Sequence, residues 1–316
     1  MHNKFYQIIF ILGMTFLQFA CMTTSYVSMQ VLQPADIIIS PQIRKIAIMN
    51  NSFFPFQKPN SITKKVSEID SLAGIDFISG LVEIMTSSPR YEVTLPYSDD
   101  ITPDIPNHID IDWNLVEKIC AIDTADALLV LDSIANNGDN NIQTVYIRGE
   151  QYAILPGRVN LGINIKLYCL SNKKIIDNQS WKINDIYNTE QNICDYAYSA
   201  GKKYGKRITP TWKDVYRNYF YGNEEMQKAV PYVRTQNWTD AATIWREFTI
   251  DKNPRIAAMS CFNMALASEM LDKLDLAKSW IDMAVQKRND PIIIQYKNAI
   301  YKRIDDEKLL NAAFGD

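Results

Sequence analysis

The chain has few of the residues that most often carry chemistry. Its 316 residues include two histidines, His2 and His108, and five cysteines that are scattered without a Cys-x-x-Cys pair. These counts exclude a histidine-based metal cage, a zinc ribbon and any histidine-dependent catalytic triad that does not use His108. Glycine is also scarce, at 11 residues, and no phosphate-binding glycine loop is present.

Neither sign of charge dominates the chain. Its 33 basic residues are balanced by 36 acidic ones, for a net charge of -3. Because this balance provides no cationic field for a polyanion, it argues against a general nucleic-acid binder. A hydrophobic content of 47% and a charged content of 22% are typical of a globular protein, and the length predicts two domains.

The N-terminal residues 1–20 have the pattern of a secretory signal peptide. Lys4 precedes an apolar stretch from Ile8 to Leu17, and Ala20 comes directly before Cys21. As a helix this stretch would cover about 15 Å, half of a bilayer core, so a spanning helix is the weaker interpretation. A small residue before cysteine is typical of a lipoprotein signal, although Gln18 replaces the usual leucine. We expect a lipid on Cys21 and a tether over residues 21–27, with an uncleaved anchor or simple secretion as alternatives.

Residues 28–215 are expected to form a mixed-sheet domain of the α/β or α+β class. Strand patterns cover residues 28–32, 45–50, 91–95, 127–135, 142–147, 158–170 and 174–182, and helical patterns cover 72–85, 113–122 and 189–207. The run from Ala127 to Leu131 is apolar on both faces, as a central strand requires. Asp112 is expected to cap the second helix, whose apolar face carries Val116, Ile119 and Cys120.

Apolar and polar side chains alternate from Val159 to Cys169, and this pattern has two interpretations. Its length fits one strand of a membrane-spanning barrel. The following segment, from Ile175 to Lys182, has no apolar face that lipid would accept. The pair therefore favours a half-buried soluble hairpin.

Residues 219–316 change to a helical pattern that resembles the tetratricopeptide repeat. A shift of the sequence against itself pairs Ala229 with Ala265, Ala241 with Ala277, and Trp245 with Ile281. Pro254 and Pro291 lie near the proline that ends this repeat, whereas Glu225 and Cys261 depart from its tryptophan position. Two units and a last helix over 291–303 are fewer than the three repeats that usually stand alone. We therefore expect docking on the first domain or capping by that last helix.

The resemblance to the repeat implies a concave groove formed by the first helix of each unit. Its expected lining is Met226, Val230, Val233, Arg234, Phe262, Leu266, Glu269 and Met270. This mostly apolar groove would bind an apolar segment of a partner protein or be filled by the last helix, and the sequence does not decide between the two.

A basic cluster and an aromatic group are two further candidate sites. The basic cluster is Lys202, Lys203, Lys206 and Arg207. Its place at a helix end favours a solvated turn, with anionic head groups or an anionic polymer as the alternative ligand. The aromatic group is Trp212, Tyr216, Tyr219, Phe220 and Tyr221, and it is interpreted as a packed domain junction rather than a ligand platform.

Two further candidates for chemistry are weak. Cys120 and His108 would make a nucleophile and base, but the cysteine lies on an apolar helix face and the histidine in a polar loop. The acidic stretch around Asp99 and Asp104 lacks the glycine and glutamate of a calcium loop. We therefore expect neither a catalytic residue nor a metal site.

Short motifs along the whole chain resemble a family of uncharacterised bacterial envelope lipoproteins with an α/β domain and a tetratricopeptide-like C-terminal tail. They are residues 31–35 (Val-Leu-Gln-Pro-Ala), 45–51, 125–129 and 200–210. More distantly, the order of strands and helices is similar to the periplasmic α/β domains of the curli-secretion lipoprotein and of TolB. The resemblance implies a non-enzymatic envelope component that acts through protein contacts.

Together these observations predict an outer-membrane lipoprotein that faces the periplasm and binds another envelope protein through its α/β domain and helical tail. Membrane attachment would come through palmitate on Cys21, with no cofactor, no metal and no nucleic-acid partner. The alternative is a periplasmic enzyme with a carboxylate-based site, since paired carboxylates leave no spacing signature in one sequence.

Overall fold

The structure is a computed structural model that describes residues 24–52, 61–95, 111–136, 143–147, 150–154, 158–186 and 193–315. The expected signal peptide, Cys21, His108 and the acidic stretch at Asp99 and Asp104 lie outside these residues.

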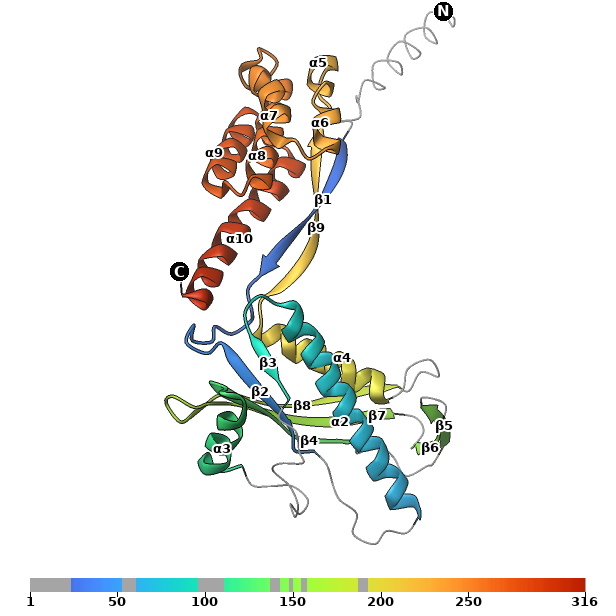
Figure 1. Cartoon of the computed structure of the whole chain (residues 1–316). Helices are drawn as coiled ribbons and strands as arrows, with labels where there is room; N and C mark the ends of the chain where they lie inside the picture. The colour runs from blue at the N-terminus through green and yellow to red at the C-terminus, as the bar shows by residue number, and fades with distance from the viewer. Residues whose placement is uncertain are drawn as a thin grey trace, which may run out of the picture. The chain divides into compact units, whose positions relative to one another are not determined.

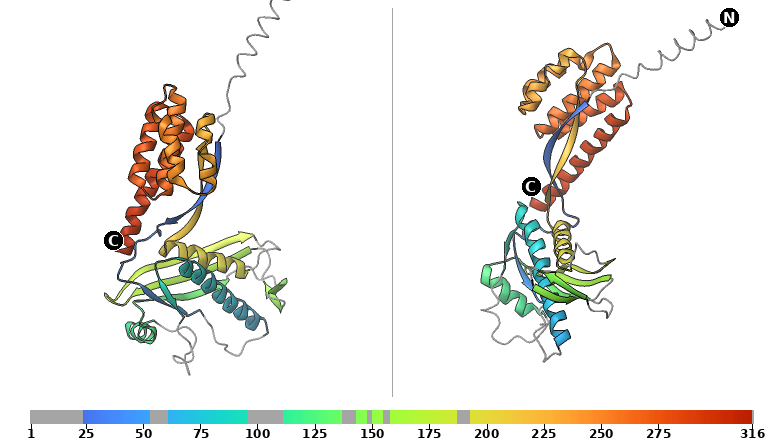
Figure 2. Two further views of the ribbon diagram at one scale, coloured as in Figure 1. Left: turned by 45° about the horizontal axis from the view of Figure 1, so that its top comes forward. Right: turned by 90° about the vertical axis from the view of Figure 1, so that its right-hand side faces the viewer.

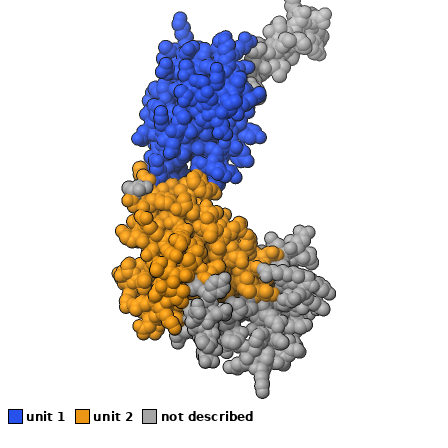
Figure 3. Space-filling view, in the orientation of Figure 1, with its two compact units in different colours: residues 1–31, 213–307 blue, residues 32–212, 308–316 orange. Residues whose placement is uncertain are grey.

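The chain divides into two compact units (Figure 3). Unit 1 comprises residues 1–31 and 213–307, and unit 2 comprises residues 32–212 and 308–316. Unit 1 is therefore assembled from two stretches of chain that are far apart in the sequence.

Unit 2 contains a five-stranded mixed sheet with the order β3-β2-β4-β7-β8 (Figure 1). Its strands are β2 (Lys45–Asn50), β3 (Glu92–Thr94), β4 (Ala127–Asn136), β7 (Arg158–Cys169) and β8 (Lys174–Ile186). Strand β2 is parallel to β3 and β4, whereas β4–β7 and β7–β8 are antiparallel. A separate hairpin joins β5 (Gln143–Ile147) and β6 (Glu150–Ile154). The predicted hairpin of residues 158–182 is thus present, and β4 is a central strand.

Helices cover both faces of this sheet because β4 is apolar on both sides. Leu129 and Leu131 face a core shared with α2 (Ser61–Ser87) and α4 (Ile193–Ile208), whereas Leu128 packs with α3 (Trp113–Asp123). The two helical layers are visible on opposite sides of the sheet in Figure 2. Helix α3 begins as predicted, with the Leu115 amide donating to the Asp112 carboxylate at 2.8 Å. The predicted fold class is confirmed.

Helices α2 and α4 cross at glycines. A Cβ at Gly201 would lie 1.9 Å from the Phe77 carbonyl oxygen, and one at Gly80 would lie 2.1 Å from the Tyr198 carbonyl oxygen. The absence of side chains at these positions lets the two backbones approach more closely than other residues would allow.

Unit 1 combines a two-stranded ribbon with helices. The ribbon is β1 (Thr24–Gln33) paired with β9 (Thr211–Phe220). The helices are α5 (Glu224–Gln227), α6 (Val230–Arg234), α7 (Trp238–Arg246), α8 (Pro254–Met270), α9 (Leu274–Lys287) and α10 (Pro291–Phe314), with a 3-10 turn at Glu247–Ile250. Their shared core includes Trp245, Phe262 and Ile281. None of the described helices is long and apolar enough to cross a membrane.

Candidate functional site

A groove of about 820 Å³ in unit 1 is the candidate site. Its strand wall consists of Ser25, Tyr26, Val27, Ser28, Met29 and Gln30 of β1, with Asp214, Tyr219 and Tyr221 of β9 and the residues after it. Its helical wall consists of Val233, Arg234, Gln236, Trp238 and Met270. The groove therefore lies between the ribbon and the turn that joins α6 to α7.

The two strands of the ribbon are antiparallel. Gln30 donates to the Asp214 carboxylate at 3.1 Å, and the rings of Tyr26 and Tyr216 meet edge to face with centroids 5.7 Å apart. Residue numbers thus increase along β1 in the direction in which they decrease along β9, which agrees with the opposite arrows of the two strands in Figure 1. Gln30, Asp214, Tyr26 and Tyr216 all lie on the face of the ribbon that is turned away from the helices. Since side chains alternate along a strand, this outer face carries even-numbered residues. Odd-numbered residues such as Tyr219 face the helices.

Asn263 of α8 fixes the end of β9 against the helices. Its side-chain oxygen accepts a 2.8 Å hydrogen bond from the Phe220 amide, and its side-chain nitrogen donates a 2.7 Å bond to the Phe220 carbonyl. Both residues are buried, so the asparagine replaces the backbone partner that a neighbouring strand would provide. This pair holds one wall of the groove in place.

Replacing Asn263 with alanine is expected to lower the free energy of unfolding of unit 1 by about 2 kcal/mol, because two buried backbone groups lose their partners. Urea unfolding of the purified chain, with hydrogen exchange to identify unit 1, measures the change. The matched control is Asn298→Ala on the exposed surface of α10. Equal stability of the two variants would contradict the proposed role of Asn263.

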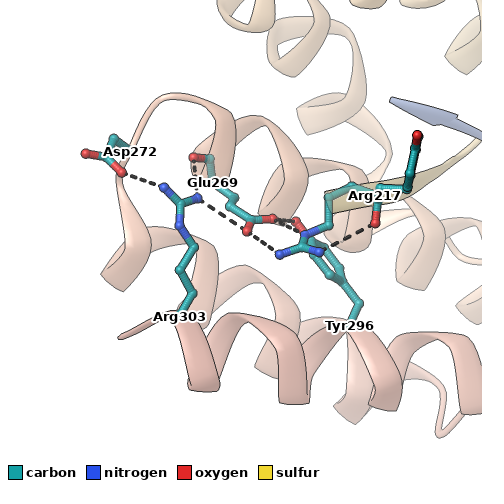
Figure 4. A network of polar contacts seen from close by, with 6 residues as sticks. Arg217, Glu269, Asp272, Tyr296 and Arg303 are labelled. Carbon is teal, nitrogen blue, oxygen red and sulfur yellow. Dashed lines mark hydrogen bonds and ion pairs between the residues drawn. The ribbon is translucent and has the colours of Figure 1, made fainter. Parts of the chain in front are cut away.

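A buried ionic network connects the ribbon to α8 and α10 (Figure 4). Arg217 donates two hydrogen bonds of 2.9 Å to the Glu269 carboxylate, which also accepts a 2.7 Å bond from the Tyr296 hydroxyl. Arg303 lies 3.3 Å from the same carboxylate and pairs with Asp272 at 2.8 Å. The Glu269 side chain is fully buried, and the carboxylate has partners for both of its oxygens.

These partners keep Glu269 charged in spite of its burial. Burial alone would raise the pKa of Glu269, but the hydrogen bonds and charge of Arg217, the Tyr296 hydroxyl and the charge of Arg303 lower it below its ordinary value. The same burial and the charge of Glu269 raise the pKa of Tyr296 well above its usual range. A carboxylate held in this way has a structural role and is unsuited to accept a proton near neutral pH.

The eight residues of the expected concave groove do not line one common surface in the structure. Met226, Val233, Phe262, Leu266 and Glu269 are buried, Val230 and Met270 are partly buried, and Arg234 is exposed. Val233, Arg234 and Met270 line the observed groove. Tyr296 of α10 contacts Phe262, with ring centroids 4.6 Å apart, and bonds to Glu269. The last helix therefore covers this part of the expected groove, as one of the two alternatives proposed.

The basic cluster at the end of α4 is divided between two acidic partners. Lys202 pairs with Glu83 at 2.7 Å, and Arg207 binds both oxygens of Asp177, at 3.0 and 3.1 Å. Lys203 and Lys206 are exposed. Binding of an anion by these four residues stays a prediction.

The thiols of the described residues are buried and reduced. Burial, together with the nearby Asp126 charge, raises the pKa of the Cys120 thiol to about 11. This value leaves the thiol protonated at neutral pH, which disfavours a nucleophilic role. Among the described residues, no group of His, Cys, Asp and Glu side chains could hold a metal ion.

The strand predicted over residues 28–32 lies within β1, whereas β9 and its pairing with β1 were not predicted. The aromatic group was interpreted as a packed junction, but Phe220 and Tyr219 are buried in a strand whereas Tyr216 and Trp212 are 67% and 53% exposed. The signal was present as a run rich in tryptophan, tyrosine and valine over residues 211–220. The pairing of this run with β1 could not be identified, because the whole of unit 2 lies between the two strands in the sequence.

Two family models match the chain. A domain of unknown function (DUF8603) matches residues 43–220, more than half of the chain, and the protein therefore belongs to this family. A second domain of unknown function (DUF6340) matches residues 227–304. No curated protein sequence is significantly similar to the chain.

Two solved structures are similar to this chain in backbone fold. The chain is similar to PelC from Paraburkholderia phytofirmans, a dodecamer, with 12% identity over 58% of this chain and 99% of that one and a TM-score of 0.31. It is also similar to the lipoprotein GNA1162 from Neisseria meningitidis, with 16% identity over 50% of this chain and 94% of that one and a TM-score of 0.25. At these values the likenesses assign no activity or partner to this chain.

Proposed function

We propose that the protein is a non-enzymatic lipoprotein of the bacterial cell envelope that binds another envelope protein through the groove of unit 1. The observation that carries this proposal is the groove itself, about 820 Å³ in volume and walled by both strand and helix residues. Concave sites of about 300–1,000 Å³ are typical of binding sites, and the lining of this one is more polar than apolar. Val233, Trp238 and Met270 provide the apolar surface, and Arg234 provides a charge.

The charged groups near the groove support binding rather than catalysis. Glu269 lies on the helix that ends at the groove, and its carboxylate is neutralised by Arg217 and Arg303. Asp214 lines the groove and accepts a hydrogen bond from Gln30. These two carboxylates have structural partners, which favours a scaffold role over a pair that shares a proton.

The membrane anchor is part of the proposal. Ala20-Cys21 at the end of an apolar segment is the pattern that supports a lipid on Cys21, an outer-membrane location and a periplasm-facing body. Palmitate labelling of the wild type and of Cys21→Ala tests the anchor. Unchanged labelling of the variant would refute it.

We also propose that the helical tail is a tetratricopeptide-like array. The residues paired in the self-comparison support it, because Ala241 and Ala277 are both buried, as are Trp245 and Ile281. Helix α10 packs Ile293 and Ile300 into the same core, which is the role expected of a capping helix.

Photocrosslinking in intact cells tests the binding function. A photoreactive amino acid at Ser28, which is exposed and lines the groove, is expected to give a specific adduct with one envelope protein. The adduct should decrease strongly when Arg234→Glu reverses the charge in the groove. The matched variant Arg246→Glu reverses an exposed charge of α7 that does not line the groove, and it should leave the adduct unchanged.

A second crosslinker position provides the negative control. Lys203 is exposed on α4 of unit 2. If Ser28 gives no adduct, or if Lys203 gives the same adduct in the same amount, binding through the groove is refuted.

A further inference from the structure

We propose that the groove receives an extended segment of the partner protein, which adds to the free edge of β1 as a third strand and places a carboxylate beside Arg234. This inference rests on the proposed binding function and names how the partner is recognised. The argument uses the order of the lining residues, the backbone groups of β1 and the charge of the helical wall.

The lining residues support a position of the groove along the edge of β1. Six consecutive residues, Ser25 to Gln30, line it. Successive side chains of a strand point to opposite faces, so a site on one face of the ribbon would be lined by every second residue. The uninterrupted run shows that the groove takes in residues from both faces of β1, with Asp214, Tyr219 and Tyr221 beside them; we infer that it follows the edge of β1, where the backbone is accessible from both faces.

The backbone groups at this edge are available for pairing. In the described part of the chain, β1 belongs to a sheet that contains only one other strand, β9. Residues 24–33 make no backbone hydrogen bond to any turn or loop among the described residues. Every second N–H and C=O of β1 therefore points away from β9, and a strand edge of this kind is a template for an added strand. Six residues give an edge of about 20 Å.

The helical wall specifies the chemistry of the added strand. Val233, Trp238 and Met270 offer an apolar surface to one row of its side chains. Arg234 is exposed, and no ion pair to it is found among the described residues. It lies close enough to Tyr219 for its charge to lower that hydroxyl's pKa, against the larger effect of burial, which raises it. A carboxylate on the added strand would complement this charge.

The charge of Arg234 also favours a different protein over a second copy of this chain. Strand β1 reads Thr-Ser-Tyr-Val-Ser-Met-Gln-Val-Leu-Gln and contains no acidic residue. Edge-to-edge pairing of two β1 strands would place no carboxylate from β1 beside Arg234. The partner segment is thus extended, with apolar side chains toward the helical wall and one carboxylate beside Arg234, away from Asp214 of the same groove.

Peptide selection on the purified full-length chain tests the proposal. The probe is a displayed library of ten-residue peptides, and the selected peptide is then synthesised in two forms that are N-methylated at alternate residues. One form blocks the amides directed at β1, and its affinity is expected to fall by about tenfold or more, because those hydrogen bonds are lost. The other form should bind within about threefold of the parent, because its methyl groups point away from β1.

Charge reversal supplies the second measurement. Arg234→Glu is expected to weaken binding of the selected peptide by about tenfold, whereas Arg246→Glu should leave it unchanged. Failure of Arg234→Glu to weaken binding would overturn the predicted carboxylate contact.

The outcomes separate strand addition from the broader binding function. Equal loss of affinity in both N-methylated forms overturns strand addition. A Ser28 adduct in cells without any selected peptide also overturns it. Neither of these two outcomes contradicts binding through the groove. Sedimentation that shows a dimer of the chain, dissociated by the parent peptide, would overturn the hetero-partner in favour of a second copy. Absence of both the adduct and a peptide refutes the proposed function itself.

Discussion

Gly201→Ala is expected to destabilise unit 2 by about 3 kcal/mol, although alanine is the better helix former. The new Cβ would lie 1.9 Å from the Phe77 carbonyl oxygen and 2.9 Å from the Leu81 nitrogen, both backbone atoms of α2. The backbones of two packed helices cannot yield as a flexible side chain would, so the cost lies at the upper end of the range for overpacking. The gain in helix propensity, about 1 kcal/mol, is smaller and of opposite sign.

Urea unfolding monitored by hydrogen exchange measures this change, because exchange in β4 reports on unit 2 and exchange in α8 reports on unit 1. Ser199→Ala, on the exposed side of α4, is the control and should be neutral or slightly stabilising. A Gly201→Ala variant as stable as the wild type would show that the helices do not depend on this close crossing.

Glu269→Gln is expected to destabilise unit 1 by about 3–5 kcal/mol, because it removes the only carboxylate bound by the Arg217 side chain among the described contacts. The Arg217 side chain is 12% exposed, so water cannot replace the lost partner. The glutamine keeps the shape of the site and some hydrogen bonds, which isolates the effect of charge. Urea unfolding with exchange in α8 as the readout measures it.

Asp282→Asn provides the matched control. Asp282 also links two helices, through Lys297 at 2.8 Å and Tyr301, but its side chain is 26% exposed. Removing this charge should cost within about 1 kcal/mol, as for surface ion pairs. If the two variants are equally stable, burial of the Glu269 network does not matter.

The network around Glu269 also predicts how the free energy of unfolding of unit 1 decreases at acidic pH. The folded pKa of Glu269 lies below its unfolded value, which is about 4.3. The stabilisation by its charge is therefore complete above that unfolded value and is lost as pH falls through the folded pKa. Unit 1 of Glu269→Gln should show a shallower loss of stability in acid than the wild type.

Strong local patterns predicted most of unit 2. The two-sided apolar run of β4, the alternation of β7 and the capping residue Asp112 each carry their own signal within a few residues. The hairpin of β5 and β6 was only half predicted, since the pattern identified residues 142–147 and not 150–154. Its sequence lacks an apolar face of the length that marks β7.

The groove could not be predicted in the same way, because its walls come from segments that interact only in the folded chain. The resemblance to the tetratricopeptide repeat implied a common surface for Val233, Arg234 and Met270, and these three line the groove. The same reasoning placed Phe262 and Leu266 there, but both are buried in the core of unit 1. Periodicity identifies an apolar face without identifying which neighbour covers it.

The divided sequence of unit 1 has a consequence for the order of folding. Gln30 and Asp214 are hydrogen-bonded although 184 positions separate them in the chain. Closing a flexible loop of that length would cost roughly 4–5 kcal/mol in chain entropy. If unit 2 folds first, it replaces the flexible loop with a compact body and brings the two strand segments together. The ribbon, and with it the groove, then forms after unit 2, and β1 waits unpaired until the chain has been synthesised past Phe220, the end of β9.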